Sequence, residues 1–321
     1  MVEGSLLAAL AAVLALAGFY APPLRFFTHM VWTVPLVVAV VRLDLRTGVM
    51  ATVVAGALVA FFAGPVPAFL LFLQFAALGL TYGYLFKIKA APGRILLYGT
   101  FVALLSMAVT LALSFWLVGL PLAGLGQELD AALENTMELY RRAGFLKALE
   151  AQGVTAEQLR QTLAAYIYWI KMLLPGILGA ASLLNALANF LVAQAVLVRL
   201  KLHSGNLPPF RYWQLPWYFI WGFIAGLALW LAGDVAQQRW AVVAGLNILY
   251  LYLPLLAGNG LAAATFLYHR LNWPPLSKAL IILALATSLP AAAILLLALG
   301  LFDPFLGYRR FEPPRGREGE D

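Results

Sequence analysis

Polar side chains recur at helical spacing within one long apolar stretch of the sequence. Ser182, Asn185 and Asn189 lie three and four residues apart, so a helix would carry all three on one face. No Asp, Glu, Lys or Arg occurs from residue 172 to residue 198, and these 27 residues would form a helix of about 40 Å. The hydrocarbon core of a bilayer is about 30 Å thick, so the stretch must span it. Lipid offers amides no hydrogen-bond partner, and this face therefore needs polar neighbours inside the protein.

Two uses of these polar groups remain open. They could line a polar cavity that binds a small ligand, or they could only hydrogen-bond neighbouring helices. The cavity interpretation adds weaker candidates for lining groups from other predicted helices: His29, Trp32, Gln74, Tyr82 and Asn247. Under either interpretation, the stretch at 163–200 is the element around which the other helices are arranged.

The sequence lacks the common catalytic and nucleotide-binding motifs. It contains no G-x-x-x-x-G-K-[ST], H-E-x-x-H or G-x-S-x-G motif, and its three histidines are far apart. The absence of cysteine excludes disulfides and thiolate metal sites. Asp234 lies in a short predicted loop. It is more simply interpreted as an acid that is solvated or paired with Arg239 than as a site that couples transport to protons. We therefore expect no enzymatic activity, no metal or cofactor and no nucleotide site, and a proton-driven pump is disfavoured.

Composition identifies the class of protein. Apolar residues make up 63% of the chain and charged residues 11%, with a mean hydropathy of +0.88. An ordinary soluble domain has about a quarter charged residues, so this chain is expected to be a polytopic, all-α bundle of transmembrane helices. The strands of a transmembrane β-barrel would show apolar and polar residues alternating in short segments, whereas the apolar runs here are long and show no such alternation. The net charge of +7 lies mostly in loops, which favours an anionic lipid surface over nucleic acid as partner.

Apolar runs predict nine spans: 4–20, 26–41, two within 47–86, 95–120, 163–200, 217–231, 240–268 and 276–302. Gly64-Pro65-Val66-Pro67 divides the pair within 47–86. Residues 124–162 alternate charged and apolar side chains, which predicts an amphipathic hairpin whose end, Thr155 with Gln158, forms a capping box. The predicted domains are a six-helix bundle over 1–202 with this insertion, three additional helices over 203–302 and an irregular polar tail over 303–321.

Loop charges predict the orientation of the chain. If nine spans alternate sides, the connections 2–3, 4–5, 6–7 and 8–9 collect ten cations, and the short loops on the other side hold two. The positive-inside rule then places the N-terminus in the cytoplasm. The tail, which contains Arg309, Arg310, Arg315 and Arg317, would be exported against the rule. Either the tail tolerates export, or one of the last three spans is re-entrant or miscounted.

Small residues in the first predicted helix could bring another helix close. Ala8 with Ala12 and Ala11 with Ala15 form overlapping small-xxx-small spacings. The order of elements up to residue 200 then resembles the S-component of energy-coupling factor (ECF) vitamin transporters. The shared features are this Ala-rich helix, a Pro-broken loop, a short second helix, the Gly64-Pro65 turn, and a sixth helix with Leu174-Pro175 near its start and a basic end at Arg199-Leu200-Lys201.

The S-component resemblance implies a partner. It implies that the ridge of Ala8, Ala12 and Ala15 docks on a separate transmembrane coupling subunit, which works with ATPases. The three additional helices depart from the six-helix pattern of that family.

Nearly the whole chain also resembles the YybS-like bacterial membrane proteins. The residues that carry this resemblance are Trp213-Gln214-Leu215-Pro216, Asn247, Asn259-Gly260, Gly300-Leu301-Phe302-Asp303 and Tyr308-Arg309. The sequence thus predicts a multi-pass protein of the bacterial cytoplasmic membrane that binds or transports a small or lipid-like solute without ATPase activity of its own. The alternative is a non-transporting scaffold for partner membrane proteins.

Overall fold

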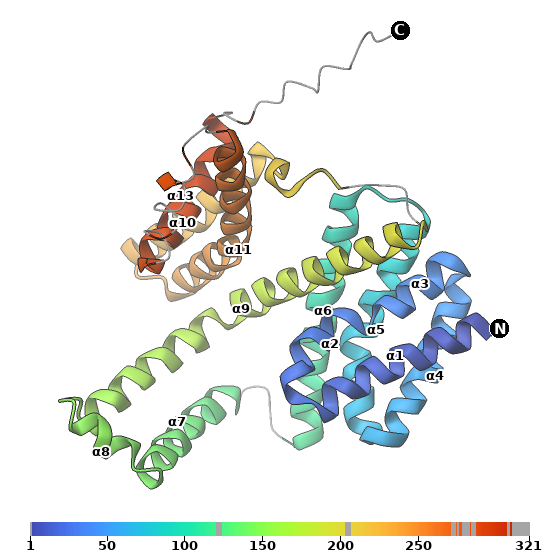
Figure 1. Ribbon diagram of the computed structural model, residues 1–321. Helices are drawn as coiled ribbons and strands as arrows, with labels where there is room; N and C mark the ends of the chain where they lie inside the picture. Colours follow the sequence, from blue (N-terminus) through green and yellow to red (C-terminus); the bar gives the residue numbers. More distant parts are fainter. Residues whose placement is uncertain are drawn as a thin grey trace. The chain divides into compact units, whose positions relative to one another are not determined.

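The computed structural model describes residues 2–119, 124–202, 207–270, 274, 276–277, 283, 287–306 and 309. In this part of the chain the regular elements are all helices, and eight are long and apolar enough to cross a membrane, which confirms the all-α polytopic prediction. The chain divides into two compact units, residues 1–206 and 207–321, coloured blue to yellow and yellow to red in Figure 1.

The first unit begins with one long helix, followed by two short helices that run back alongside it. Helix α1 (Val2–Tyr20) is followed by the 3-10 turn η1 (Pro22–Leu24) and by two short helices, α2 (Arg25–Val31) and α3 (Val34–Arg42). Arg42 Nη2 lies 2.9 Å from Glu3 Oε1, so α2 and α3 together return along the length of α1. The predicted second span, 26–41, is divided at residues 32–33, because Pro35 lacks an N–H and its ring would clash with the carbonyl four residues earlier in a continuous helix, whereas proline is tolerated in the first turn of α3.

The next three helices follow their local sequence signals. α4 (Leu45–Ala63) and α5 (Pro65–Lys87) are divided at Gly64, as predicted, and the φ of +93° at this glycine would strain other residues. Asp44 caps α4, since its carboxylate accepts a hydrogen bond from the Thr47 N–H at 2.6 Å. That bond lowers the pKa of the Asp44 carboxyl. α6 (Pro92–Val118) begins with a proline, which suits a first turn.

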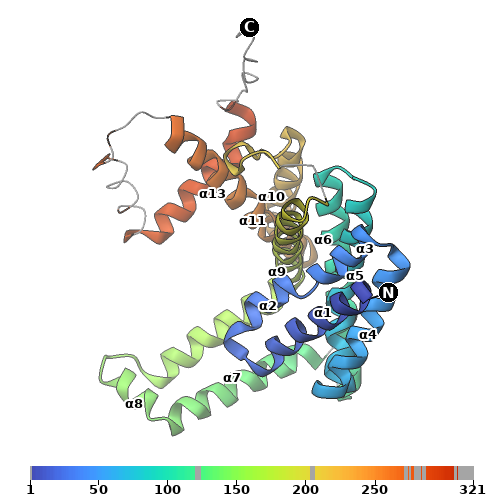
Figure 2. The same ribbon diagram turned by 45° about the vertical axis from the view of Figure 1, so that its right-hand side comes forward.

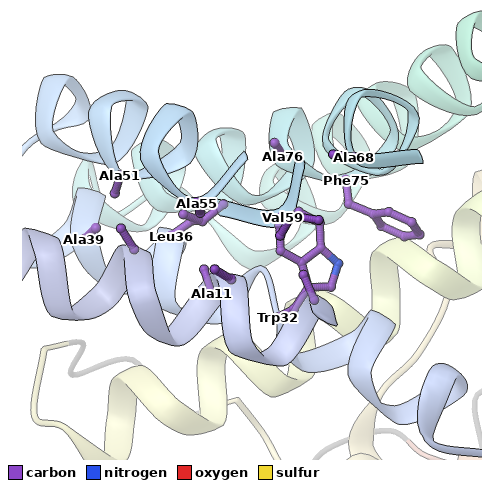
Figure 3. Packing of buried hydrophobic residues seen from close by; sticks show 13 residues of the cluster. Ala11, Trp32, Leu36, Ala39, Ala51, Ala55, Val59, Ala68, Phe75 and Ala76 are labelled. Atoms are coloured by element: carbon purple, nitrogen blue, oxygen red, sulfur yellow. The ribbon is translucent and has the colours of Figure 1, made fainter. Parts of the chain in front are cut away.

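The alanine ridge of α1 already has a partner inside this unit. Ala8, Ala12 and Ala15 are buried in a core that includes Ala51 and Ala55 of α4. Figure 3 shows side chains of this core lying between neighbouring helices. Docking of the ridge on a coupling subunit stays a prediction, and it would require a partner helix to displace α4 from these alanines. Small side chains allow close approach by any helix, and here the chain's own helix makes that approach.

The predicted amphipathic hairpin is made of two helices and the start of a third. α7 (Leu125–Arg142) and α8 (Phe145–Glu150) lead to α9 (Ala156–Arg199), which begins at the predicted capping box of Thr155 and Gln158. Ion pairs Asp130–Lys171 and Glu134–Arg160, both at 2.7 Å, join α7 to the first part of α9. α9 has 44 residues, about 66 Å, so it extends well beyond one bilayer thickness.

Three basic connections emerge at one end of the first unit, here called the basic end. Lys87 Nζ donates to the Leu43 carbonyl at 2.6 Å, which brings the connections at 42–47 and 87–94 together. The ring of Phe86 stacks on that of Phe190 with centroids 5.7 Å apart, so the last turns of α9 also lie there. This common end agrees with the loop alternation that the orientation prediction assumes.

Single cysteines test the orientation, because the chain has none of its own. Lys89, in a basic connection, and Gln152, after α8, are both exposed. We expect a membrane-impermeant maleimide to label Gln152→Cys but not Lys89→Cys in intact cells, since cation-rich loops remain in the cytoplasm. Both variants should be labelled after lysis, as the control. Labelling of the Lys89→Cys variant alone in intact cells would reverse the topology.

The second unit consists of a loop and three long helices. The loop carries two 3-10 turns, η3 (Phe210–Tyr212) and η4 (Trp217–Phe219), and leads into α10 (Ile220–Val235), α11 (Arg239–Arg270) and α13 (Leu289–Leu306). α10 and α11 form a hairpin, and α13 packs against α11 (Figure 2). Asp303, which was predicted to begin an irregular tail, lies within α13, and most of 271–288 and of the tail lies outside the described residues.

Candidate functional site

The predicted polar face of α9 exists, and its amides are bonded to one another and to the end of the α2–α3 break. Asn189 is buried, and its Oδ1 accepts a hydrogen bond from Thr33 Oγ1 at 2.7 Å. Its Nδ2 donates to the main-chain carbonyl and to the side-chain Oδ1 of Asn185, both at 3.0 Å. Both polar atoms of the Asn189 amide thus have partners, and the amide connects α9 to Thr33, the residue just before α3.

Two further predicted residues join α9 to its neighbours in the same way. Tyr82 of α5 donates its hydroxyl proton to the Ala186 carbonyl at 2.7 Å. Ser182 lies 3.5 Å from Met107 Sδ of α6, a weak contact with a poor acceptor. For Ser182, Asn189 and Tyr82 the structure therefore agrees with the helix-bonding interpretation, in which each contact contributes about 0.6 to 2 kcal/mol.

Asn185 differs from these residues because it borders open space. It is half-buried and lines a groove of about 530 Å³ on α9, here called the α9 groove. The other lining residues are apolar: Met30, Ala181, Leu184, Leu187, Ala188 and Leu191. Asn185 Oδ1 accepts from Asn189, and among the described residues its Nδ2 has no partner. The groove is thus an apolar surface with one amide donor, which differs from the polar cavity of the first of the two interpretations.

The remaining predicted lining groups lie elsewhere. Trp32 is fully buried between α1, α4 and α5, with its ring 4.9 Å from that of Phe72, and its Nε1–H has no partner among the described residues. Gln74 is half-buried on α5 and does not line the α9 groove. Asn247 belongs to the second unit and donates to the Val243 carbonyl of its own helix at 2.8 Å. The side chain of His29 lies outside the described residues.

A second polar cluster, in the other unit, was not predicted. Asp303 and Arg309 are almost completely buried and form a bidentate ion pair, in which Nε donates to Oδ1 at 2.7 Å and Nη2 donates to Oδ2. Arg309 Nη2 also donates to Asn259 Oδ1 at 3.0 Å, and Nη1 donates to the carbonyls of Arg211 and Trp213 at 3.1 and 2.9 Å. These residues are here called the Asp303 cluster. Every acidic oxygen in it accepts a hydrogen bond, so the cluster binds elements together rather than presenting a reactive group.

Asn259 connects the cluster to the helix core. Its Nδ2 donates to the Gly300 carbonyl at 2.8 Å and to Asp303 Oδ2 at 3.3 Å, and its Oδ1 accepts from the Leu215 N–H at 3.3 Å. One amide of α11 therefore contacts both α13 and the loop before α10. A buried polar group at membrane depth requires such partners, and this requirement could have indicated the cluster from sequence.

The cluster also corrects the predicted position of Arg309. Strict alternation of nine spans would place Arg309 at the end opposite to Arg211, but the two residues are hydrogen-bonded. The ring of Tyr212 beside them packs edge-on against that of Phe266, near the end of α11, with ring centroids 6.1 Å apart. The described end of α13 thus lies with the loop at 211–213. The structure supports the second alternative, in which one of the last three spans does not cross as counted.

The described residues offer no site built for metal chemistry: no three His, Asp or Glu side chains in this part of the chain come together as potential ligands. No curated protein and no solved structure matches the sequence. The likeness to ECF S-components therefore gains no support from these comparisons.

Several residues that carry the YybS-like resemblance come together in the second unit. Trp213, Leu215, Asn259, Asp303 and Arg309 all take part in the Asp303 cluster. A family model, described as Predicted membrane protein (DUF2232), matches residues 9–304. Because this match covers most of both units, the chain belongs to the DUF2232 family of predicted membrane proteins, which is the YybS-like family.

Proposed function

We propose that this protein binds a lipid-like ligand in the α9 groove and moves or presents it within the membrane. The observation that supports the proposal is the groove itself, which has six apolar lining residues and the single amide of Asn185. Its volume of about 530 Å³ lies within the usual range of about 300 to 1,000 Å³ for small-molecule sites. An apolar wall with one hydrogen-bond donor suits an acyl chain that ends in or carries a carbonyl or ester oxygen.

A small polar solute suits the groove less well. Such a solute would need several hydrogen-bond partners, and the polar atoms of Asn189 and Tyr82 are already bonded within the bundle. Breaking those bonds would leave buried groups unpaired, which costs about 1–3 kcal/mol each. The lipid-like ligand is therefore preferred over a vitamin-like one.

The proposal assigns the chain no ATPase activity of its own. If transport is energised, the S-component resemblance implies a separate coupling subunit with ATPases, and that subunit would contact a surface other than the buried ridge of Ala8, Ala12 and Ala15. A scaffold without a ligand would have no need of the α9 groove, so ligand binding separates the two functions.

Filling the α9 groove tests the proposal. Ala188 lines it, and Ala188→Trp would occupy space that an acyl chain needs. With a diazirine-bearing phospholipid in vesicles, we expect wild-type crosslinks within residues 181–191 and at least a fivefold lower yield in the variant. Asn185→Leu should also lower the yield, because it removes the one donor.

Ala195→Trp is the matched control, since Ala195 is exposed on the same helix and does not line the groove. Its crosslinking yield should equal that of the wild type. If Ala188→Trp and Ala195→Trp gave the same yield, the label would report ordinary lipid contact, and the proposed binding function would be rejected.

A further inference from the structure

A second groove, here called the Arg94 groove, lies at the basic end of the first unit. It has a volume of about 590 Å³ and is bordered by the start of α4, the end of α5 and the start of α6. Leu80, Leu85 and Val102 supply apolar walls, and Tyr84, Arg94 and Tyr98 supply polar groups. The Arg94 groove shares no lining residue with the α9 groove.

The depth of this groove can be judged from the helices that border it. Its lining residues on α6 extend from Arg94 to Val102, and those on α5 and its C-cap extend from Leu80 to Ile88. Eight residues of helix correspond to about 12 Å, so both walls run from the basic end roughly to the middle of one bilayer leaflet. This is the depth at which the glycerol and upper acyl carbons of a phospholipid lie.

Arg94 supplies a positive charge that no described residue neutralises. It is exposed at the start of α6, and its side chain forms no hydrogen bond or ion pair with the rest of the described chain. Two other cations at this end have partners, since Arg42 pairs with Glu3 and Lys87 donates to the Leu43 carbonyl, and Lys89 of the same connection does not line the groove. None of the residues that line the Arg94 groove is acidic. The groove therefore combines apolar walls with an uncompensated cation at its mouth.

Two tyrosines complete the mouth. Tyr84 and Tyr98 line the groove, and each has about half of its surface exposed. Tyrosine favours the boundary between hydrocarbon and water, where its ring is in lipid and its hydroxyl can donate to a headgroup. A guanidinium group binds phosphate through two parallel N–H bonds, and basic residues at this boundary attract anionic lipids.

We propose that the Arg94 groove is a binding site for one anionic phospholipid of the surrounding membrane. The phosphate binds Arg94 and the hydroxyls of Tyr84 and Tyr98, and an acyl chain lies on Leu80, Leu85 and Val102. Charge complementarity selects an anionic over a zwitterionic lipid, because the latter brings its own cation to the site. This proposal concerns different helices from the α9 groove and does not depend on the function proposed for that groove.

Lipid retention measured by native mass spectrometry tests the proposal. The full chain is reconstituted in bilayers of equal phosphatidylglycerol and phosphatidylcholine, extracted in mild detergent and weighed. We expect the wild type to retain one phosphatidylglycerol, Arg94→Gln to lose at least nine tenths of that occupancy, and Arg94→Lys to lose less. Val102→Trp, which fills the apolar wall, should lose it as well while the charge is unchanged.

Lys89→Gln is the matched control, because Lys89 is an exposed cation of the same connection and does not line the groove. Its retention should equal that of the wild type. Equal losses in Lys89→Gln and Arg94→Gln would show only general surface attraction and would overturn the site. Wild-type protein that retains no phosphatidylglycerol, or that releases it to millimolar glycerol 3-phosphate, would overturn the lipid assignment too.

Discussion

Replacing Asp303 by asparagine is expected to destabilise the second unit by about 3–5 kcal/mol, the largest effect among the substitutions considered. The change leaves the guanidinium of Arg309 buried without a counter-charge, and a buried unpaired charge is far more costly than a lost surface pair. Both side chains are almost completely inaccessible to solvent. Thermal unfolding in detergent, followed by tryptophan fluorescence, should show a clear decrease in melting temperature.

A double replacement separates the cost of an unpaired charge from the value of the pair. Asp303→Leu with Arg309→Leu removes both charges, so it should be less destabilising than either single replacement. Glu138→Gln is the control, because it removes an exposed ion pair with Arg142 and should change stability by less than about 1 kcal/mol. If the double variant were as unstable as the sum of the singles, the charges would contribute independently, and the pair would not organise this region.

Adding one methyl group to Gly300 is expected to have the second largest effect. A Cβ at this position would overlap the carbonyl oxygen of Leu256, and a Cβ at Gly260 would overlap that of Leu296. Main-chain atoms cannot rotate away, so α11 and α13 would have to separate. Overpacking of this kind costs about 1–3 kcal/mol and occasionally more. Separation would also lengthen the bond from Asn259 Nδ2 to the Gly300 carbonyl.

Gly258 provides the matched control for Gly300→Ala. It lies on the same helix as Gly260, and a Cβ added there meets no other atom within 4 Å. Gly258→Ala should therefore be neutral or stabilising by about 0.5–1 kcal/mol, since alanine loses less entropy in a helix. The melting temperatures of the two variants, measured side by side, test whether α11 and α13 approach each other closely at Gly300. An unchanged melting temperature for Gly300→Ala would contradict the close approach of α11 and α13.

The two grooves lie in the first unit, and the Asp303 cluster lies in the second. In the two proposals, the first unit carries both lipid-facing grooves, and the second unit carries the charged cluster that fixes its own loop and helix ends. The stability predictions and the lipid predictions therefore concern different residues. A substitution of Asp303 should lower the stability of the second unit and leave lipid retention at Arg94 unchanged. A substitution of Arg94 should lower lipid retention and leave the stability of the second unit unchanged.

Local features of the sequence were sufficient to predict that the protein is a membrane protein and to predict several helix boundaries. Hydropathy over about 20 residues decides whether a helix can lie in lipid, whatever its neighbours are. The turn at Gly64 and the capping box at Thr155 were also predicted correctly, since their hydrogen bonds and backbone angles involve residues only a few positions apart. The break between α2 and α3 had a local signal as well, in Pro35.

Only the tertiary structure decided which groups are partners. Thr33 bonds Asn189 across 156 positions of sequence, and Arg309 bonds the Arg211 carbonyl across 98. An amide at membrane depth must find a partner, but the sequence does not say whether that partner is a ligand or another helix. Small-xxx-small spacing likewise predicts a close helix without identifying it, and α4 rather than another protein lies on the alanines of α1. The chemistry of each side chain was readable from the sequence, whereas its partner depends on how the helices pack.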